Sequence, residues 1–289
     1  GIVCASAGNH AQGVAMAARH FGARATIVMP RTTPAIKVDA VRRLGGTVVQ
    51  EGDDYDAAST HAKGLPGTFV HPFDDEDVIA GQATIALELV RQAPPGLEAI
   101  YVPIGGGGLA AGIGAVFSLL RPDVRIVGVE PTRAASMRAA FANGGPTTLE
   151  RIGRFADGVA VRRVGDLTYR LCRETVHEIV TVDDDAVCAA IKDLYEARRA
   201  ILEPAGAIAT AAAKAHAPRG STVVALACGA NVDFDTLRHV SERAEIGERR
   251  EAVLAVTIPE RPGAFREFCR ALGPCAVTEF NYRIADAAK

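Results

Sequence analysis

Residues 100–112 read IYVPIGGGGLAAG, and this stretch decides the fold. An apolar run ends at Ile104, four consecutive glycines follow, and an Ala-rich stretch begins at Leu109. A continuous apolar run, without polar alternation, is typical of a strand that is buried on both faces of a parallel sheet. The stretch therefore predicts a buried strand, a tight glycine turn and a helix.

The same alternation of apolar run and Ala-rich stretch recurs on both sides of this segment. Strands are predicted at residues 2–5, 25–29, 47–50, 68–71, 99–103, 125–129, 179–182 and 222–227. Helices are predicted at residues 10–21, 36–44, 81–92, 109–120, 184–199 and 204–216. Strands that alternate with helices indicate an α/β fold with parallel, right-handed connections.

The end of the chain has a different composition. Residues 242–251 (ERAEIGERRE) are highly charged and indicate the end of a helix that runs into a linker. A strand (253–258), a Pro–Gly turn (259–263), a helix (264–272) and a second strand (277–284) are predicted after it. Two strands and one helix are marginally stable alone. Because the chain also opens on Gly1, directly onto the strand predicted at residues 2–5, we expect both ends to be cut.

Composition limits the possible functions. The 289 residues are 48% hydrophobic and 23% charged, with a formal net charge of −2 and a pI of about 6.4. Nothing here favours binding to nucleic acid or to an anionic membrane, and no apolar run is long enough to span a membrane. The six cysteines show no metal-ligand spacing, so we expect no metal site and reduced thiols in the cytoplasm.

A first candidate site is the loop SAGNHAQG at residues 6–13, where the first predicted strand meets a helix. Free N–H groups at a helix start suit a carboxylate or a phosphate, and the small residues Ala7 and Gly8 allow close approach. Ser6, Asn9 and His10 add hydrogen-bonding side chains. The alternative is a plain helix cap made by Ser6 or Asn9.

A second candidate site is the run Gly105, Gly106, Gly107 and Gly108 with Leu109 after it. Successive N–H groups at the start of a helix form a natural phosphate site. One alternative is a tight turn, for which one or two glycines suffice. Another is a dinucleotide site, because residues 105–110 fit the pattern G-x-G-x-x-A and Glu130 ends the following strand.

A third candidate is Cys228, in the sequence ACGAN that follows the strand predicted at residues 222–227. Ligands of α/β proteins bind at the carboxyl ends of the strands, where this residue is placed. A buried structural cysteine is the alternative.

These loops together resemble those of the second structural class of pyridoxal-phosphate enzymes, whose fold is similar to the tryptophan synthase β subunit. Within that class the chain resembles the biosynthetic threonine ammonia-lyases. The resemblance extends from end to end and includes SAGNHAQG (6–13), IKVDAVRRLGG (36–46), AGQATIALEL (80–89), VPIGGGGLAAG (102–112), GVAV (158–161), LEPAGA (202–207), CGANV (228–232), VSERAEIGERREAVLAVTIPE (240–260) and VTEFNYRIADA (277–287).

The resemblance implies two parallel-sheet domains, at residues 1–82 and 83–245, each with helices on both faces. It implies the start of an ACT-like regulatory domain at residues 246–289. It also assigns roles to the candidate residues. Asn9 would bind the ring hydroxyl of the cofactor and the Ser6–His10 loop the substrate carboxylate, while N–H groups of residues 105–109 would hold the phosphate. Cys228 would face the ring nitrogen, where serine is commoner in the family.

In the family, the Schiff-base lysine lies in a Ser-Phe-Lys segment upstream of the SAGNH loop. The lysines of this chain have no such context; they are Lys37, Lys63, Lys192, Lys214 and Lys289. We therefore expect the 289 residues to contain no catalytic residue and to be inactive by themselves.

For the complete protein the resemblance implies deamination of L-threonine to 2-oxobutanoate and ammonia, the first step of isoleucine biosynthesis. It implies L-serine as a second substrate, isoleucine as the effector and a homo-oligomer, namely a tetramer. Two other classes stay open at this point: a nicotinamide-dependent dehydrogenase, and a ligand-binding module without catalysis.

Overall fold

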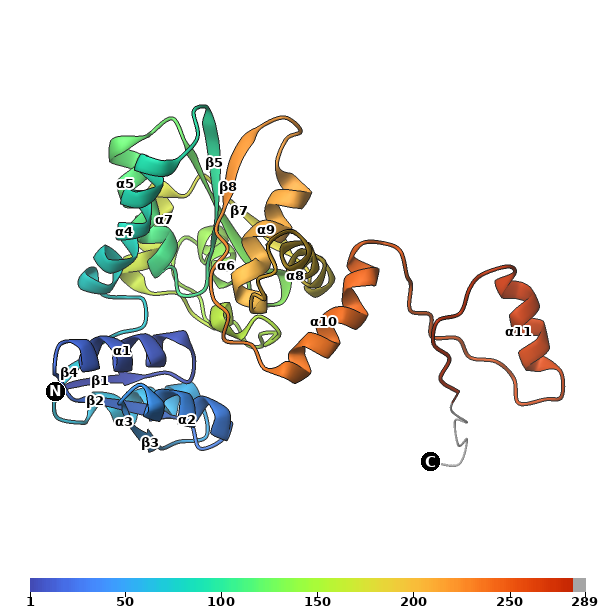
Figure 1. Ribbon diagram of the computed structural model, residues 1–289, viewed down its shortest axis with the longest axis horizontal. Helices are drawn as coiled ribbons and strands as arrows, with labels where there is room; N and C mark the ends of the chain where they lie inside the picture. Colours follow the sequence, from blue (N-terminus) through green and yellow to red (C-terminus); the bar gives the residue numbers. More distant parts are fainter. Residues whose placement is uncertain (283–289) are drawn as a thin grey trace. The chain divides into compact units, whose positions relative to one another are not determined.

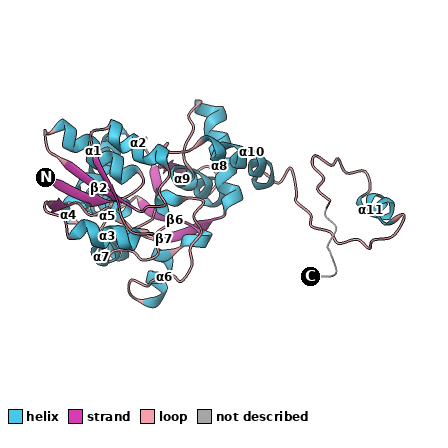
Figure 2. Ribbon diagram, turned by 90° about the horizontal axis from the view of Figure 1, so that it is seen from below, coloured by secondary structure: helices cyan, strands magenta, loops and turns pink. Residues whose placement is uncertain are grey.

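The computed structural model describes residues 1–282. The chain divides into two units, residues 1–251 and residues 252–289. The first unit contains two four-stranded sheets in which every pairing is parallel, with helices between successive strands. Figure 1 shows the two sheets, and Figure 2 shows helices on either side of the strands. The predicted α/β class with parallel connections is confirmed.

The first sheet has the strand order β3-β2-β1-β4. Its strands are β1 (Ile2–Ala5), β2 (Ala25–Met29), β3 (Thr47–Gln50) and β4 (Thr68–Phe69). Alternate side chains are buried on opposite faces. Cys4 and Ile27 pack on one face with α1 (Asn9–His20) and α2 (Ala35–Arg43), whereas Val3 and Val28 pack on the other with α3 (Tyr55–Lys63). Burial on both faces explains why the strands are apolar throughout.

The second sheet has the strand order β7-β6-β5-β8. Its strands are β5 (Leu97–Pro103), β6 (Arg125–Pro131), β7 (Glu178–Val182) and β8 (Thr222–Ala225). One face, with Ile100 and Val102, packs on α4 (Glu76–Gln92), α5 (Gly108–Leu120), α6 (Ser136–Asn143) and α7 (Asp166–Thr175). The other face, with Tyr101 and Val129, packs on α8 (Asp184–Arg198), α9 (Pro204–His216) and α10 (Phe234–Gly247).

Some boundaries differ from the sequence prediction. Helix α4 begins at Glu76 and not at Gly81, because the Asp75 carboxylate caps it by accepting the N–H groups of Asp77 and Val78. Strand β4 ends at Phe69 and not at residue 71, where the chain turns into α4. Helices α3, α6 and α7 were not predicted, and of α10 (Phe234–Gly247) only the end was predicted, at residues 242–251.

The described part of the second unit contains α11 (Ala264–Leu272), as predicted. The strand predicted at residues 253–258 is wrong, and residues 277–282 are not a strand either. Residues 283 and 284, the end of that second prediction, lie outside the described residues. A strand forms only by pairing, and over residues 252–282 neither segment has a hydrogen-bonded partner strand. Apolar side chains such as Val253 (80% exposed) and Leu254 (67%) remain uncovered.

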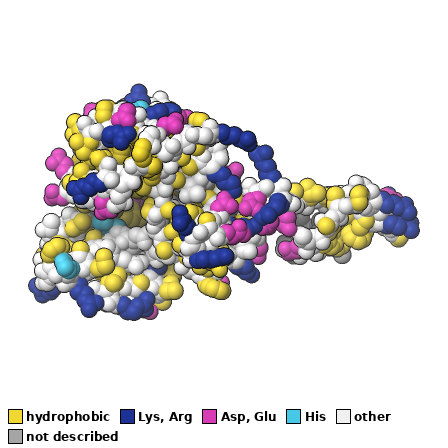
Figure 3. Space-filling model, turned by 45° about the horizontal axis from the view of Figure 1, so that its top comes forward, with side chains coloured by type: hydrophobic (Ala, Val, Ile, Leu, Met, Phe, Trp, Pro, Cys, Tyr) yellow, Lys and Arg dark blue, Asp and Glu magenta, His cyan; other side chains and the backbone are white. Residues whose placement is uncertain are grey.

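The surface carries charges of both signs. On the face shown in Figure 3, Lys and Arg side chains lie among Asp and Glu side chains. Ion pairs of this kind join Lys192 to Glu245 (2.5 Å) and Arg243 to Asp185 (2.5 Å), which link α8 to α10. Among residues 1–282, no helix has both the length and the apolar character that a membrane crossing needs.

Candidate functional site

The three predicted loops all follow the carboxyl ends of strands. Ser6–His10 follows β1, the glycine turn (defined as residues 105–109) follows β5, and Cys228 lies just beyond β8. A short 3₁₀ turn contacts residues near two of these loops. Gly158 of the 3₁₀ turn η2 (Asp157–Val159) lies so close to Glu203 that a Cβ there would be 3.3 Å from its carboxylate, and Val159 lies against Gly105.

Steric crowding explains all four glycines of the glycine turn. A Cβ would lie 2.9 Å from the Val159 Cα at Gly105, 2.1 Å from the Phe73 Cγ at Gly106, and 3.0 Å from the Phe73 carbonyl oxygen at Gly108. Gly107 has a left-handed φ of +100°. A tight turn alone needs only one or two glycines, and packing against Val159 and Phe73 accounts for the others.

The N–H groups of the glycine turn are free. Within residues 1–282, none of the five consecutive amide groups from Gly105 to Leu109 has an acceptor. Gly106, Gly107 and Gly108 are nevertheless buried. Buried N–H groups normally have partners. Five neighbouring N–H groups without partners, three of them on buried residues, suit an oxyanion at the positive end of α5.

The Ser6–His10 loop is held at its two ends. The Ser6 Oγ accepts the N–H of Gly8 (3.1 Å), and the His10 Nε2 lies 3.1 Å from the carbonyl oxygen of Val70. Burial lowers the pKa of His10, which favours a neutral imidazole. Helix α1 has no side-chain cap, and within residues 1–282 the N–H groups of Asn9 and His10 have no acceptor. A plain helix cap made by Ser6 or Asn9 therefore does not account for these N–H groups.

Glu203 connects the loops after β1 and β8. It is 5% exposed, accepts the Asn9 Nδ2 at 2.6 Å with one oxygen and accepts the N–H of Asn231 at 3.1 Å with the other. Burial raises the pKa of Glu203, while the hydrogen bond from Asn9 opposes the shift. Sequence reasoning missed this residue. Its signal was the motif LEPAGA, in which Pro204 starts α9 and leaves the preceding side chain at the helix entrance.

Two known protein families match different parts of the chain. Residues 1–229 match the family described as pyridoxal-phosphate dependent enzyme. The chain belongs to that family. Residues 242–289 match the C-terminal regulatory domain of threonine dehydratase. Within the family, the chain groups with the biosynthetic threonine dehydratases.

Two curated relatives illustrate the likeness. The chain is 53% identical over 300 residues to the biosynthetic L-threonine dehydratase of Burkholderia multivorans, and 52% identical over 295 residues to that of Escherichia coli. Each match covers 99% of this chain but only 59% and 57% of the relatives, so the chain spans less than two thirds of their length.

Solved structures show the same fold. The processed form of threonine deaminase isoform 2 from Solanum lycopersicum matches with a TM-score of 0.81 at 46% identity, over 84% of this chain and 73% of that chain. Maize serine racemase matches with a TM-score of 0.77 at 34% identity, over 87% of this chain and 79% of that chain. The residues present fit the family's cofactor, because the glycine turn offers free, buried N–H groups to a phosphate.

Cys228 has an exposed side chain, so the alternative of a buried structural cysteine is wrong. Its N–H donates to the carbonyl oxygen of Gly206 at 3.2 Å, and a Cβ on Gly206 would lie 1.6 Å from the Cys228 carbonyl oxygen. The backbone at Cys228 is therefore fixed against the start of α9, one turn from Glu203, while the thiol stays accessible.

Glu130 does not fit the role of a ribose-binding acid, which the dehydrogenase alternative requires. Glu130 is fully buried at the end of β6, where its carboxylate accepts the N–H groups of Met137 (2.7 Å) and Arg138 (2.9 Å). It caps α6 and is not available to bind a ribose. Burial raises the pKa of Glu130 to about 7, and these two hydrogen bonds oppose the shift.

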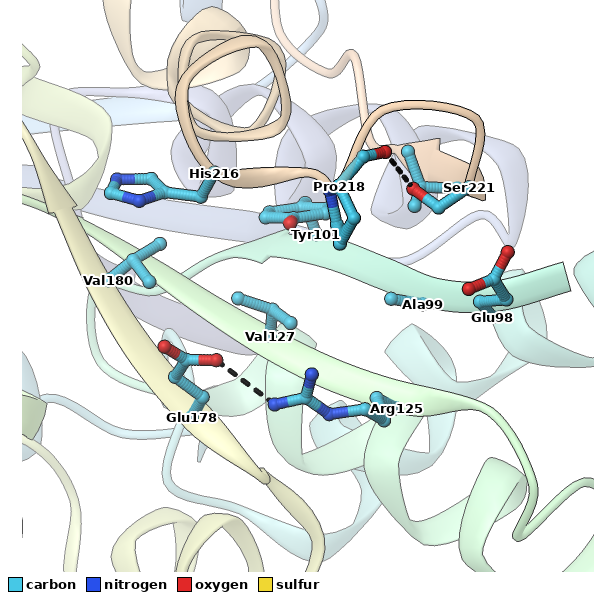
Figure 4. Close-up of a pocket in the computed structure, with 11 residues that line it drawn as sticks. Glu98, Ala99, Tyr101, Arg125, Val127, Glu178, Val180, His216, Pro218 and Ser221 are labelled. Carbon is cyan, nitrogen blue, oxygen red and sulfur yellow. Dashed lines mark hydrogen bonds and ion pairs between the residues drawn. The ribbon is translucent and has the colours of Figure 1, made fainter.

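A cavity of about 190 Å³ lies away from these loops, at the amino ends of the strands. Figure 4 shows Glu98, Arg125 and Glu178, from the starts of β5, β6 and β7, with His216 from the end of α9. Arg125 and Glu178 form an ion pair at 3.0 Å. This cavity contains none of the predicted site residues.

Proposed function

We propose that the chain forms the cofactor- and substrate-binding part of a threonine dehydratase, which converts L-threonine to 2-oxobutanoate and ammonia. The observation that carries the proposal is the row of five free N–H groups in the glycine turn, three of them on buried residues. The proposed units are a smaller domain at residues 1–82, a larger domain at 83–245 and the start of an ACT-like domain at 246–289. The names of the relatives support the choice of substrate.

The loops divide the binding of cofactor and substrate in this proposal. The glycine turn binds the phosphate of pyridoxal phosphate through backbone N–H groups, so no cationic side chain is required. The Asn9 amide, oriented by Glu203, donates to the ring hydroxyl oxygen. The loop Ser6, Ala7, Gly8, Asn9 and His10 binds the substrate carboxylate, for which the N–H groups of Asn9 and His10 are free within residues 1–282.

When bound, pyridoxal phosphate supplies an electron sink for the carbon from which the α-proton leaves. Cys228 would lie beside the ring nitrogen. A thiol is a weak, neutral donor, so it would leave that nitrogen less protonated than an aspartate would. Moderate electron withdrawal favours prompt loss of the β-hydroxyl over other reactions. L-serine is the proposed second substrate, because one methyl group discriminates by only about 1–3 kcal/mol.

We further propose that residues 1–289 alone bind the cofactor without a covalent bond and have no lyase activity. Three lysines are ion-paired: Lys37 with Asp157 (2.8 Å), Lys192 with Glu245, and Lys214 with Asp193 (2.7 Å). Lys63 lies over the ring of Phe69, 5.7 Å from its centre, and Lys289 lies outside the described residues. Within residues 1–282, none of the four described lysines makes a hydrogen bond, ion pair or cation–π contact with residues 105–109. Lys37 comes nearest through Asp157 of η2, whose Val159 lies against Gly105.

The assembly and regulation of the complete protein are also proposals. The match to a threonine dehydratase regulatory domain supports an effector, for which isoleucine is the proposed compound. We propose a homotetramer in the cytoplasm; the relatives from Solanum lycopersicum and Arabidopsis thaliana are named as chloroplastic.

The test uses pyridoxal phosphate with Gly107→Ala, and Gly144→Ala as the matched control. Both glycines have positive φ, but a Cβ at Gly107 would lie 2.7 Å from Met137, whereas at Gly144 it would meet nothing within 4 Å. Only Gly107→Ala should abolish binding, followed by cofactor fluorescence. Borohydride should trap no adduct at a unique lysine. A Gly107→Ala chain that binds normally would overturn the cofactor site; a trapped adduct would overturn non-covalent binding.

The complete protein should form 2-oxobutanoate from L-threonine, and residues 1–289 should not. If residues 1–289 bind the cofactor but the complete protein deaminates neither L-threonine nor L-serine, a ligand-binding module without catalysis becomes the better interpretation.

A further inference from the structure

The carbonyl side of the glycine turn is held by α7. The Thr168 Oγ1 donates to the carbonyl oxygen of Gly106 at 2.7 Å, and the Cys172 Sγ lies 3.7 Å from that of Gly107. Thr168 and Cys172 are both 0% exposed. In a trans peptide the carbonyl and the following N–H point in opposite directions. Holding these two carbonyls therefore directs the N–H groups of Gly107 and Gly108 away from α7.

Helix α7 is capped from a distant part of the chain. Its own N-cap residue, Gly165, has no side chain to do so. The Asp74 carboxylate accepts the N–H groups of Asp166 (3.1 Å), Leu167 (3.0 Å) and Thr168 (3.0 Å). One carboxylate thus satisfies three of the free N–H groups at the positive end of the helix, through charge-assisted hydrogen bonds.

The segment that carries Asp74 also contacts the glycine turn directly. The His71 Nδ1 accepts the N–H groups of Phe73 (3.2 Å) and Asp74 (2.8 Å), which fixes the turn between β4 and α4. The Phe73 ring lies on Gly106, where a Cβ would be only 2.1 Å from it. A Cβ at Gly165 would likewise lie only 2.1 Å from the Oδ1 of Asp74. The cap, the helix start and the glycine turn are therefore packed as one body.

From these contacts we infer that Asp74 is a positioning residue for phosphate recognition. It does not touch the ligand. It fixes the start of α7, and Thr168 in the first turn of that helix fixes the orientation of the Gly106–Gly107 peptide. This inference rests on the proposal that the glycine turn binds the phosphate of pyridoxal phosphate, and it adds the residue that keeps the N–H groups aligned before the ligand arrives.

The experiment compares two probes on the chain of residues 1–289. The first is 4′-deoxypyridoxine 5′-phosphate, which has the phosphate but no aldehyde and so cannot react with a lysine. The second is pyridoxine, which lacks the phosphate. Asp74→Ala should weaken the phosphate probe about tenfold in calorimetry. Asp74→Asn should weaken it only about threefold, because an amide oxygen can still accept from Leu167 and Thr168.

The affinity for pyridoxine, followed by NMR titration, should stay within about twofold in both variants. The matched control is Asp183→Ala. Asp183 caps α8 by accepting the N–H of Ala186 at 2.8 Å, and α8 packs on α9 and α10. This control removes a helix-capping carboxylate of the same kind, and it should leave the phosphate probe unaffected.

Thr168→Val provides the second route, since it removes the hydrogen bond to Gly106 and keeps Asp74. It should also weaken the phosphate probe selectively, and the double variant should lose less than the product of the two single effects. If the unsubstituted chain binds the phosphate probe and Asp74→Asn and Thr168→Val bind it equally well, this inference is wrong and the cofactor site stands. If the Asp74 variants bound both probes more weakly by the same factor, Asp74 would have only a structural role. No binding of the phosphate probe by the unsubstituted chain would overturn the cofactor site itself.

Discussion

The glycine turn and the Ser6–His10 loop are both strand-to-helix connections with free N–H groups, but they differ in how tightly they are held. Every glycine of the turn is in contact with side chains or backbone, and α7 holds its carbonyls. A Cβ at Gly8 would meet nothing within 4 Å. The tight turn suits a group that stays bound through the reaction, such as a phosphate. The looser loop suits a substrate that enters and leaves.

The largest expected effect tests this difference with one methyl group in each loop. Gly106→Ala places a Cβ 2.1 Å from the Phe73 ring and should weaken 4′-deoxypyridoxine 5′-phosphate binding about a hundredfold or more, at a cost of about 1–3 kcal/mol in the free energy of unfolding. Gly8→Ala should change both quantities little, because Gly8 has a φ of −116° and open space around it. Calorimetry and urea unfolding measure the two effects. Equal losses in the two variants would remove the distinction between the loops.

A smaller effect is expected where the Ser6–His10 loop meets the larger sheet. Glu203→Gln replaces one of the two carboxylate oxygens by an NH₂ group, which cannot accept a hydrogen bond. Either Asn9 or Asn231 therefore loses its acceptor. The phosphate probe, which also carries the ring hydroxyl, should bind about fivefold more weakly. Glu98→Gln is the control, because this exposed carboxylate accepts a backbone N–H from Thr222 far from both loops. Unchanged binding in Glu203→Gln would mean that Asn9 needs no orientation.

The smallest effect concerns Glu130, whose helix α6 brings Met137 against Gly107. Burial raises the pKa of Glu130 from an ordinary 4.5 to about 7. The folded state therefore holds this proton more tightly than the unfolded state does. Its contribution to stability is complete below about pH 4.5 and disappears as the pH rises through about 7.

Urea unfolding of the wild type and of Glu130→Gln at pH 5, 6, 7 and 8 measures this contribution. The wild type should lose on the order of 1 kcal/mol or more relative to the variant between the two extremes. The difference between the two proteins isolates Glu130 from the other titrating groups. Parallel pH profiles would show that its carboxyl titrates normally.

Sequence reasoning succeeded where the signal is local. The buried strands, the glycine turn and the helix at residues 264–272 can each be predicted from a few neighbouring residues. The strand at 253–258 failed because pairing depends on a distant segment. Asp74 and Glu203 were missed for the same reason, since their partners lie 92–94 and 194 residues away in the chain. Helix α7 was missed as well, although its position decides how the glycine turn is held.

Cys172, whose sulfur contacts the Gly107 carbonyl of the glycine turn, can report when this site opens. Cys172 is 0% exposed, and burial raises its pKa to about 12, so very little thiolate is present at neutral pH. Cys228, Cys269 and Cys275 are exposed. Burial also raises the pKa of Cys228, so a thiol reagent should label Cys269 and Cys275 first and reach Cys172 only when α7 separates from the turn. The rate of that slow labelling, followed by mass spectrometry, would give the opening frequency of the phosphate site without any ligand or mutation.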